Sequence, residues 1–221
     1  MKKLYSILYA VLLLCVVGTG IFIILSPDRI PMHYNAAGEV DRIGSKYENL
    51  ILPVMNLGMG AFFLLMAKGP RKKGERSNER ILLISGICTL LFLTLLSFYF
   101  MWKALRYDPE NVRQDSVNHV YRFVSIGMGA LLVILGNIMP KLRRNAMLGL
   151  RTKWSLANDR VWQKSQRFGG MASVAAGLVM IILAMFIPGT WNLAMMAAVT
   201  LIWVSLCVWA SRRYYLEDNN G

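Results

Sequence analysis

The sequence predicts an all-α integral membrane protein with six transmembrane helices, and three features of its composition support this fold class. Hydrophobic residues make up 56% of the 221 positions and the mean hydropathy is +0.44, which is too apolar for an ordinary soluble domain. The apolar residues gather in six blocks, each close to the ~20 residues that cross ~30 Å of hydrocarbon. None of these blocks contains Asp, Glu, Lys, Arg or His. The predicted spans are Leu4–Leu25, Leu50–Ala67, Ile81–Trp102, Phe123–Met139, Phe168–Ile187 and Trp191–Ala210.

The distribution of charge predicts which loops face the cytoplasm. With the N-terminus inside, the inner segments hold 18 of the 25 basic residues and five acidic residues, an excess of 13 positive charges. The outer loops hold seven basic and seven acidic residues, so they carry no net charge. Because cytoplasmic loops are enriched in Lys and Arg, both termini and the segments 68–80 and 140–167 are expected inside. Attraction to anionic lipids accounts for the positive charge, and we expect no direct nucleic-acid partner.

The first block is expected to remain in the protein as a transmembrane helix. It follows two lysines, as the apolar core of a signal peptide would, but it is long, and Gly18–Gly20 makes a poor cleavage site. Leu14 is also too large to precede the cysteine of a lipoprotein signal. The three cysteines lie within predicted spans, so we expect no disulfide framework. They are Cys15, Cys88 and Cys207.

A small extended hairpin is expected in the loop that follows the first span. Ile30–Tyr34 and Val40–Ile43 have the residue types of short strands. Asn35–Gly38 between them is typical of a turn with glycine at a position of positive φ. We therefore expect a hairpin that lies over the outer ends of the helices.

Three polar side chains of this loop, His33, Asn35 and Asp41, have two interpretations. In one they form a metal or substrate site that His119 of the next outer loop completes. Imidazole nitrogen and carboxylate oxygen are ligands that suit zinc. In the other they satisfy the turn itself through Asx-type hydrogen bonds, and no cofactor is needed. The spacing matches no compact metal signature, so His33, Asp41 and His119 are a candidate zinc site only on residue type.

The second and fourth spans share the tetrapeptide GMGA, at residues 58–61 and 127–130. The match has two interpretations, a duplicated helix unit or a coincidence, since such matches arise easily in apolar sequence. In either case, small residues at this spacing allow helices to approach closely. Each span also contains an asparagine, Asn56 or Asn137, that we expect to hydrogen-bond across helices and to contribute about 1 kcal/mol.

The remaining connectors predict how the chain is divided. Residues 68–80 are typical of an inner turn, residues 103–122 of a polar outer loop, and Pro188–Thr190 of a tight outer turn. We expect an N-terminal membrane unit over residues 1–67, a middle part over 68–122 and a C-terminal membrane domain over 123–221.

Residues 140–167 are the longest stretch that is neither apolar nor terminal, and we call them the inner basic segment. Pro140 ends the preceding helix, and Gly149 permits a left-handed turn. Ser155 is the expected N-cap of a short helix with Asp159 in its first turns. The tryptophans expected at headgroup level are Trp154 and Trp162. On residue chemistry alone, this segment is equally well interpreted as a connector that its charge holds in the cytoplasm.

Two stretches carry residue patterns that are specific enough to compare with known families. The inner pattern comprises Gly136-Asn137, Pro140, Arg143 to Asn145, Gly149-Leu150-Arg151-Thr152, Trp154, Trp162 and Arg167-Phe168. It resembles the SdpI family of bacterial immunity proteins, which are small membrane proteins that protect a cell against a secreted toxic peptide. The outer pattern comprises Pro31, His33, Tyr34, Asn35, Gly38, Asp41, Gly44 and Lys46. It resembles the short domain of unknown function that often precedes the SdpI domain.

The resemblance implies a multi-pass protein of the bacterial cell membrane that confers resistance to a secreted toxic peptide. It also implies a receptor role, in which toxin binding holds a small cytoplasmic helix-turn-helix autorepressor at the membrane. The outer residues expected to meet the peptide are His33, Tyr34, Asn35, Asp41 and Lys46. The inner residues expected to meet an acidic patch on the repressor are Asn137, Arg143, Arg144, Asn145, Arg151, Trp154, Trp162 and Arg167. Neutralising Arg143, Arg144 and Arg151 together is expected to abolish recruitment and to leave resistance intact.

Two other classes of function stay open. An integral-membrane enzyme would be a metal-dependent hydrolase at His33 and Asp41, or a lipid-modifying enzyme at Arg143 and Arg151. The sequence contains no nucleophile motif, P-loop, dinucleotide fingerprint or HExxH pattern. A small transporter is disfavoured because the predicted spans carry none of the ionisable residues that ion coupling usually needs.

Overall fold

The computed structural model describes residues 1–35, 40–72, 76–107, 115–145 and 148–220. Its helices are α1 (Lys2–Leu25), α2 (Ile51–Lys72), α3 (Arg76–Leu105), α4 (Asp115–Ile138), α5 (Asp159–Phe186) and α6 (Trp191–Asn219). Within the described residues, six helices are long and apolar enough to cross a membrane. The six predicted spans are therefore confirmed. The short 3₁₀ turns η1 (Lys46–Leu50) and η2 (Met139–Lys141) precede α2 and follow α4.

Most of the helices begin or end outside the apolar blocks, and α5 shows the reason. The sequence predicted a short separate helix capped by Ser155 before the fifth span, and this was wrong. The N-cap is Asn158, whose Oδ1 accepts from the Val161 amide at 2.9 Å, and α5 runs without interruption from Asp159. The added turns are amphipathic, because Val161 and Trp162 are buried while the charged residues between them and Phe168 lie outside.

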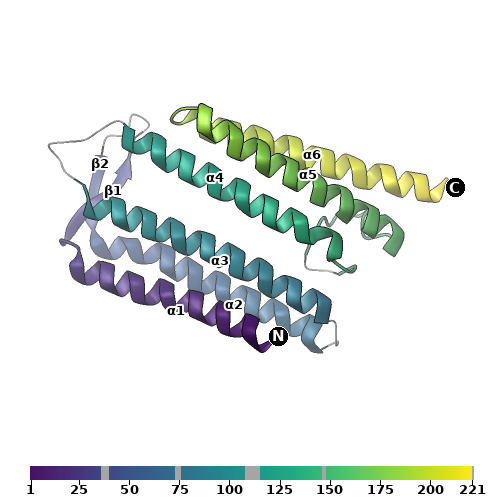
Figure 1. Ribbon diagram of the computed structural model, residues 1–221, viewed down its shortest axis with the longest axis horizontal. Helices are drawn as coiled ribbons and strands as arrows, with labels where there is room; N and C mark the ends of the chain where they lie inside the picture. The colour runs from purple at the N-terminus through teal and green to yellow at the C-terminus, as the bar shows by residue number, and fades with distance from the viewer. Residues whose placement is uncertain (36–39, 73–75, 108–114, 146–147, 221) are drawn as a thin grey trace.

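The helices form two units of three that lie side by side (Figure 1). We call α1, α2 and α3 the N-terminal unit, and α4, α5 and α6 the C-terminal unit. Helix α3 packs extensively against α1 and α2, and α4 against α5, whereas the contact of α3 with α4 is much smaller. The chain termini lie at one end of the molecule, and strands β1 and β2 lie at the other (Figure 1). On the charge distribution described above, we refer to the strand end as the outer end and to the opposite end as the inner end.

The outer hairpin pairs β1 (Arg29–Tyr34) with β2 (Val40–Ser45) in antiparallel register. The predicted extended hairpin is confirmed, although residues 36–38 of the expected turn Asn35–Gly38 lie outside the described residues. Ile30 is 1% exposed and packs with Phe22 of α1 and Met101 of α3. The hairpin is therefore anchored on the outer ends of the N-terminal unit.

Interlocking large side chains and polar contacts between helices hold the N-terminal unit together. Leu8 of α1 and Leu83 and Leu90 of α3 are each 0% exposed and belong to one apolar cluster. In the middle of the unit, Asn56 Nδ2 of α2 donates to Thr94 Oγ1 of α3 at 2.7 Å and lies 3.3 Å from Cys15 Sγ of α1. The predicted cross-helix bond of Asn56 is confirmed.

Backbone contact between glycines holds α4 and α5 together. A Cβ atom built on Gly129 would lie 2.7 Å from the Gly177 carbonyl oxygen, and one built on Gly136 would lie 2.7 Å from that of Gly170. The two contacts are seven residues apart on each helix, so they fall on one antiparallel seam. Only glycine allows two helix backbones to approach this closely.

The two units meet along α3 and α4. Near the outer end, Tyr99 of α3 stacks on Phe123 of α4 with ring centroids 4.5 Å apart and an interplanar angle of 11°. Near the inner end, Ile81 of α3 joins a buried cluster with Leu142 and Trp162. We call the boundary between the two units the seam.

Candidate functional site

The outer hairpin holds the residues that the sequence singled out as a metal or peptide site. His33 Nδ1 lies 2.6 Å from Asp41 Oδ1, so the predicted pair is brought together across the two strands. The side chains are 64% and 44% exposed. His119 lies on the exposed surface of α4. Among the described residues, no group of three His, Cys, Asp or Glu side chains is arranged to hold a metal ion, and zinc binding stays a prediction.

The other predicted residues of this loop differ in what they can offer a ligand. Lys46 is only 13% exposed in its side chain, and its Nζ donates to the Ser26 carbonyl at 3.2 Å and pairs with Asp28 at 3.2 Å. This lysine ties the hairpin to the end of α1, and its role in ligand binding stays a prediction. Asn35 is partly buried and has a bonded partner. The side chain of Tyr34 lies outside the described residues.

A cavity of about 370 Å³ lies beneath the hairpin, and we call it the outer cavity. It is formed by β1, η1, α2, α3 and α4, so both three-helix units contribute to it. Its walls are mostly apolar, with a few charged groups from different elements. Residues that line it include Met32, His33, Glu48, Leu52, Phe100, Lys103 and Tyr121. Sequence analysis identified only His33 of this set, because the others lie in separate, unremarkable apolar or polar stretches.

The start of η1 holds Glu48, the acidic side chain in the lining of the outer cavity, in place. Ser45 caps η1, and Glu48 Oε1 in turn accepts from the Ser45 amide at 2.9 Å. Glu48 also pairs with Arg42 at 2.8 Å. This reciprocal capping box fixes the carboxylate at the rim of the outer cavity.

At the inner end, a set of short hydrogen bonds fixes residues 149–152. Gly149 has φ of 90°, which favours glycine. The buried Gln166 side chain accepts from the Leu150 amide at 3.0 Å and donates to the Leu150 carbonyl at 2.9 Å. Ser155 Oγ donates to the same carbonyl at 2.8 Å. The loop is therefore held rigidly against α5, and it presents Arg151 from a fixed backbone position.

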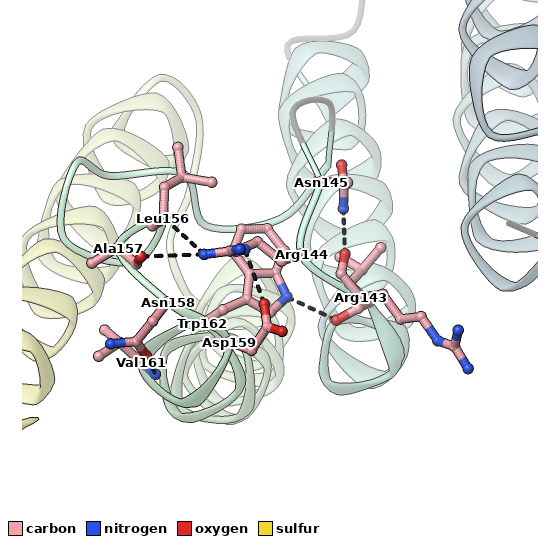
Figure 2. A network of polar contacts seen from close by, with 10 residues as sticks. Arg143, Arg144, Asn145, Leu156, Ala157, Asn158, Asp159, Val161 and Trp162 are labelled. Atoms are coloured by element: carbon pink, nitrogen blue, oxygen red, sulfur yellow. Dashed lines mark hydrogen bonds and ion pairs between the residues drawn. The ribbon is translucent and has the colours of Figure 1, made fainter. Parts of the chain in front are cut away.

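Arg144 belongs to the architecture of the loop. Its Nε pairs with Asp159 Oδ1 at 2.9 Å, and its Nη1 donates to the carbonyls of Ala157 at 3.2 Å and Leu156 at 3.4 Å. Figure 2 shows the Arg144 guanidinium between these groups, while the guanidinium of Arg143 points away from them. Arg144 thus joins the end of the loop to the first turn of α5.

Other cations of the inner basic segment lack such partners. Arg160 pairs with Asp218 at 3.5 Å, and Lys153 and Lys164 lie against aromatic rings, whereas the other four have no acidic or hydrogen-bonding partner for their side chains among the described residues. These four are Lys141, Arg143, Arg151 and Arg167. Arg143, Arg151 and Arg167 are exposed, so they are the residues of the predicted inner face that can engage a partner directly.

The uncharged residues predicted for the inner face have different roles. Trp162 is 1% exposed, and its Nε1 donates to the Leu142 carbonyl at 2.8 Å, so its predicted headgroup position was wrong. Trp154 is partly exposed beside Lys153, whose Nζ lies 5.1 Å from the ring centroid. Asn145 holds the loop, because it donates to the Arg143 carbonyl at 2.8 Å and accepts from the Leu148 amide at 2.7 Å.

Asn137 also departs from its predicted environment. It lies exposed near the end of α4, and no cross-helix hydrogen bond to a described residue involves it. The expectation that it stabilises the bundle as Asn56 does was wrong, because the inward face of α4 at this level is taken by Gly136 against α5. Its exposure leaves Asn137 free to take part in contacts at the inner end.

A basic pocket of about 600 Å³ lies on the inner end, where the end of α4 meets the start of α5. Its described lining includes four cations and one carboxylate. These are Lys141, Arg143, Arg144, Arg167 and Asp159. Because Asp159 is already paired with Arg144, the remaining charge of the pocket favours an acidic partner.

Comparisons with known proteins agree with the two residue patterns. The profile of the SdpI/YfhL protein family matches residues 141–211, and that of a domain of unknown function (DUF1648) matches residues 10–57. Over 196 residues the chain is 26% identical to "Immunity protein SdpI" of Bacillus subtilis (strain 168), which covers 88% of this chain and 87% of that protein. No solved structure matches the chain. The resemblance to the SdpI family, with the shorter domain before it, is confirmed.

Proposed function

We propose that this relative of the SdpI family is a membrane immunity protein that gives resistance to a secreted toxic peptide. The observation that carries the proposal is the outer cavity, which on the orientation expected from the charge distribution opens on the side from which such a peptide arrives. The similarity to an immunity protein along most of the chain supports the same function. The six candidate spans place the protein in the membrane, where a membrane-active peptide would reach it.

The chemistry of the outer cavity suits an amphipathic peptide. Leu52, Phe100 and Tyr121 supply apolar and aromatic surface for a hydrophobic side chain. His33 and Glu48 at the hairpin side can hydrogen-bond to peptide amides and carbonyls. Because both three-helix units line the cavity, a bound peptide would contact both at once.

Filling the outer cavity tests this proposal. In a toxin-sensitive strain, Leu52→Trp is expected to lower the tolerated toxin concentration roughly tenfold, because the indole occupies the binding volume. The matched control is Val54→Trp on the same helix, since Val54 is 63% exposed and lies outside the cavity lining. Membrane abundance of both variants is measured by immunoblot. Full resistance in Leu52→Trp at wild-type abundance would exclude the outer cavity as the peptide site.

We further propose that the inner end recruits a cytoplasmic helix-turn-helix repressor, with Arg143 and Arg167 as the residues that attract its acidic surface. Both line the basic pocket and lack a partner among the described residues, so their charge is available for steering. Arg144 is left out of the recruiting set because Asp159 already neutralises it. Anionic lipids of the same leaflet are a further expected partner of the basic segments.

Repressor recruitment can be separated from resistance. Arg143→Gln with Arg167→Gln is expected to leave a fluorescent repressor in the cytoplasm after toxin addition, while resistance is retained. The control pair Lys153→Gln with Lys164→Gln removes the same charge from outside the basic pocket. Fluorescence at the membrane is the measurement. Normal recruitment by the Arg143/Arg167 variant would assign the repressor contact to another surface.

A further inference from the structure

A second cavity lies on the seam in the inner half of the molecule, and we call it the inner-seam cavity. Its volume is about 330 Å³, and it is lined by α2, α3, α4, α5, α6 and the loop of residues 148–151. The walls are mostly apolar, as Phe63 and Leu135 illustrate. The cavity is separate from the basic pocket, although Leu142 lines both.

One charged residue is found among the described lining residues of this cavity, and it is Arg151. The hydrogen bonds of Gln166 and Ser155 to Leu150 hold the neighbouring backbone, so Arg151 is presented by a rigid loop. The residue itself is exposed and has no ion-pair partner in the described part of the chain. An apolar cavity with a single cationic side chain in its described lining is complementary to an amphiphile with an anionic head.

A buried hydrogen-bond donor in the lining of the cavity is a second, independent observation, because it favours a ligand that brings an acceptor. Trp203 of α6 lines the cavity, and its Nε1 is buried without a hydrogen-bond partner among the described residues. Trp203 lies nine residues before Arg212, which places it about 13 Å deeper along the helix than that inner-end cation. A buried indole N–H without an acceptor is costly, so a ligand that brings an oxygen to this depth would be favoured.

We propose that the inner-seam cavity binds one anionic glycerophospholipid from the cytoplasmic leaflet. The phosphate lies on Arg151, an ester carbonyl accepts from Trp203 Nε1, and an acyl chain packs along Leu135 and Phe63. Thr152, which follows Arg151, hydrogen-bonds to Ser211 of α6, so Arg151 lies nearer the inner end than Trp203, in the same order as the phosphate and the ester of a glycerophospholipid. The lipid would bridge the N-terminal and C-terminal units. This site goes beyond the proposed function, because it requires neither a toxin nor a repressor.

The test uses purified full-length protein in mild detergent, with thermal unfolding and native mass spectrometry as readouts. The probes are phosphatidylglycerol, phosphatidylcholine with the same acyl chains, and glycerol 3-phosphate. Phosphatidylglycerol is expected to raise Tm in a saturable way and to be retained as a single lipid per chain. Phosphatidylcholine is expected to raise Tm by a smaller amount. Glycerol 3-phosphate should have no effect, and an effect equal to that of phosphatidylglycerol would overturn the lipid assignment in favour of a free phosphate ligand.

Three variants assign the contacts. Arg151→Gln is expected to weaken the binding of phosphatidylglycerol roughly tenfold, to the affinity of phosphatidylcholine. The control Lys153→Gln is expected to keep the preference for phosphatidylglycerol over phosphatidylcholine. Trp203→Phe is expected to weaken the binding of both lipids by a similar factor, because both carry the ester carbonyl. Leu135→Trp fills the cavity and is expected to abolish retention of either lipid. Equal behaviour of Arg151→Gln and Lys153→Gln, or retained lipid in folded Leu135→Trp, would overturn the proposal.

Discussion

The N-terminal and C-terminal units associate three helices each, and they do so in opposite ways. The N-terminal unit fits large side chains such as Leu83 and Leu90 together and adds one buried polar contact at Asn56. Where α4 meets α5 in the C-terminal unit, glycines stand in place of larger residues. The two backbones therefore touch at Gly129–Gly177 and Gly136–Gly170. In lipid, where apolar burial alone does not drive helices together, close packing and buried hydrogen bonds are the two available means.

The repeated GMGA tetrapeptide makes the comparison direct. In α2, a Cβ atom on Gly58 would have no neighbour within 4 Å, and one on Gly60 would meet only the side chain of Leu12. In α4, the corresponding Gly129 meets the backbone of Gly177. Identical residues therefore have different roles, because the partner helix decides whether a glycine is required. The shared tetrapeptide gives no sign of a common packing arrangement.

The largest expected effect comes from adding volume to the glycine contact. Gly170→Val places a Cβ 2.6 Å from the Gly136 carbonyl oxygen, and backbone cannot yield as a side chain can. We expect a loss of about 3 kcal/mol and little monodisperse protein after purification. Gly58→Val is the matched control and should purify as the wild type does. A normal yield and Tm for Gly170→Val would show that α4 and α5 can separate without cost.

A smaller effect is expected from the polar contact of the N-terminal unit. Asn56→Ala removes the hydrogen bond to Thr94 and should lower the free energy of unfolding by about 1 kcal/mol. Asn137→Ala should have no measurable effect, because that residue is exposed on α4. Both are measured by thermal unfolding in the same detergent. Equal destabilisation by the two substitutions would contradict the difference in burial on which the comparison depends.

Much of the fold follows from local sequence. Hydropathy alone locates all six spans, because each contains enough consecutive apolar residues to cross the membrane. Strand residue types locate the hairpin, and Asn56 is recognisable as an uncommon polar residue within a span. The start of α5 was missed because its first turns are charged on one side, so they do not resemble a span.

The site was less predictable, because its decisive contacts join distant residues. Arg143 and Arg144 are neighbours with the same chemistry, yet only the structure shows Arg144 paired with Asp159 and the Arg143 guanidinium unpaired among the described residues. Gln166, which fixes Leu150 from 16 residues away, carries no motif of its own. The outer cavity and the inner-seam cavity are each assembled from five or more elements, and no linear pattern identifies their lining.

The central claim is that the hairpin and the inner basic segment face opposite sides of the membrane, and cysteine labelling in intact cells tests it most directly. In a background with Cys15, Cys88 and Cys207 replaced by alanine, Arg42→Cys and Lys153→Cys each introduce one exposed thiol. A membrane-impermeant maleimide is expected to label Arg42→Cys in intact cells and Lys153→Cys only after lysis. Labelling of Lys153→Cys in intact cells would place the inner basic segment outside, where no cytoplasmic repressor or inner-leaflet lipid could reach it.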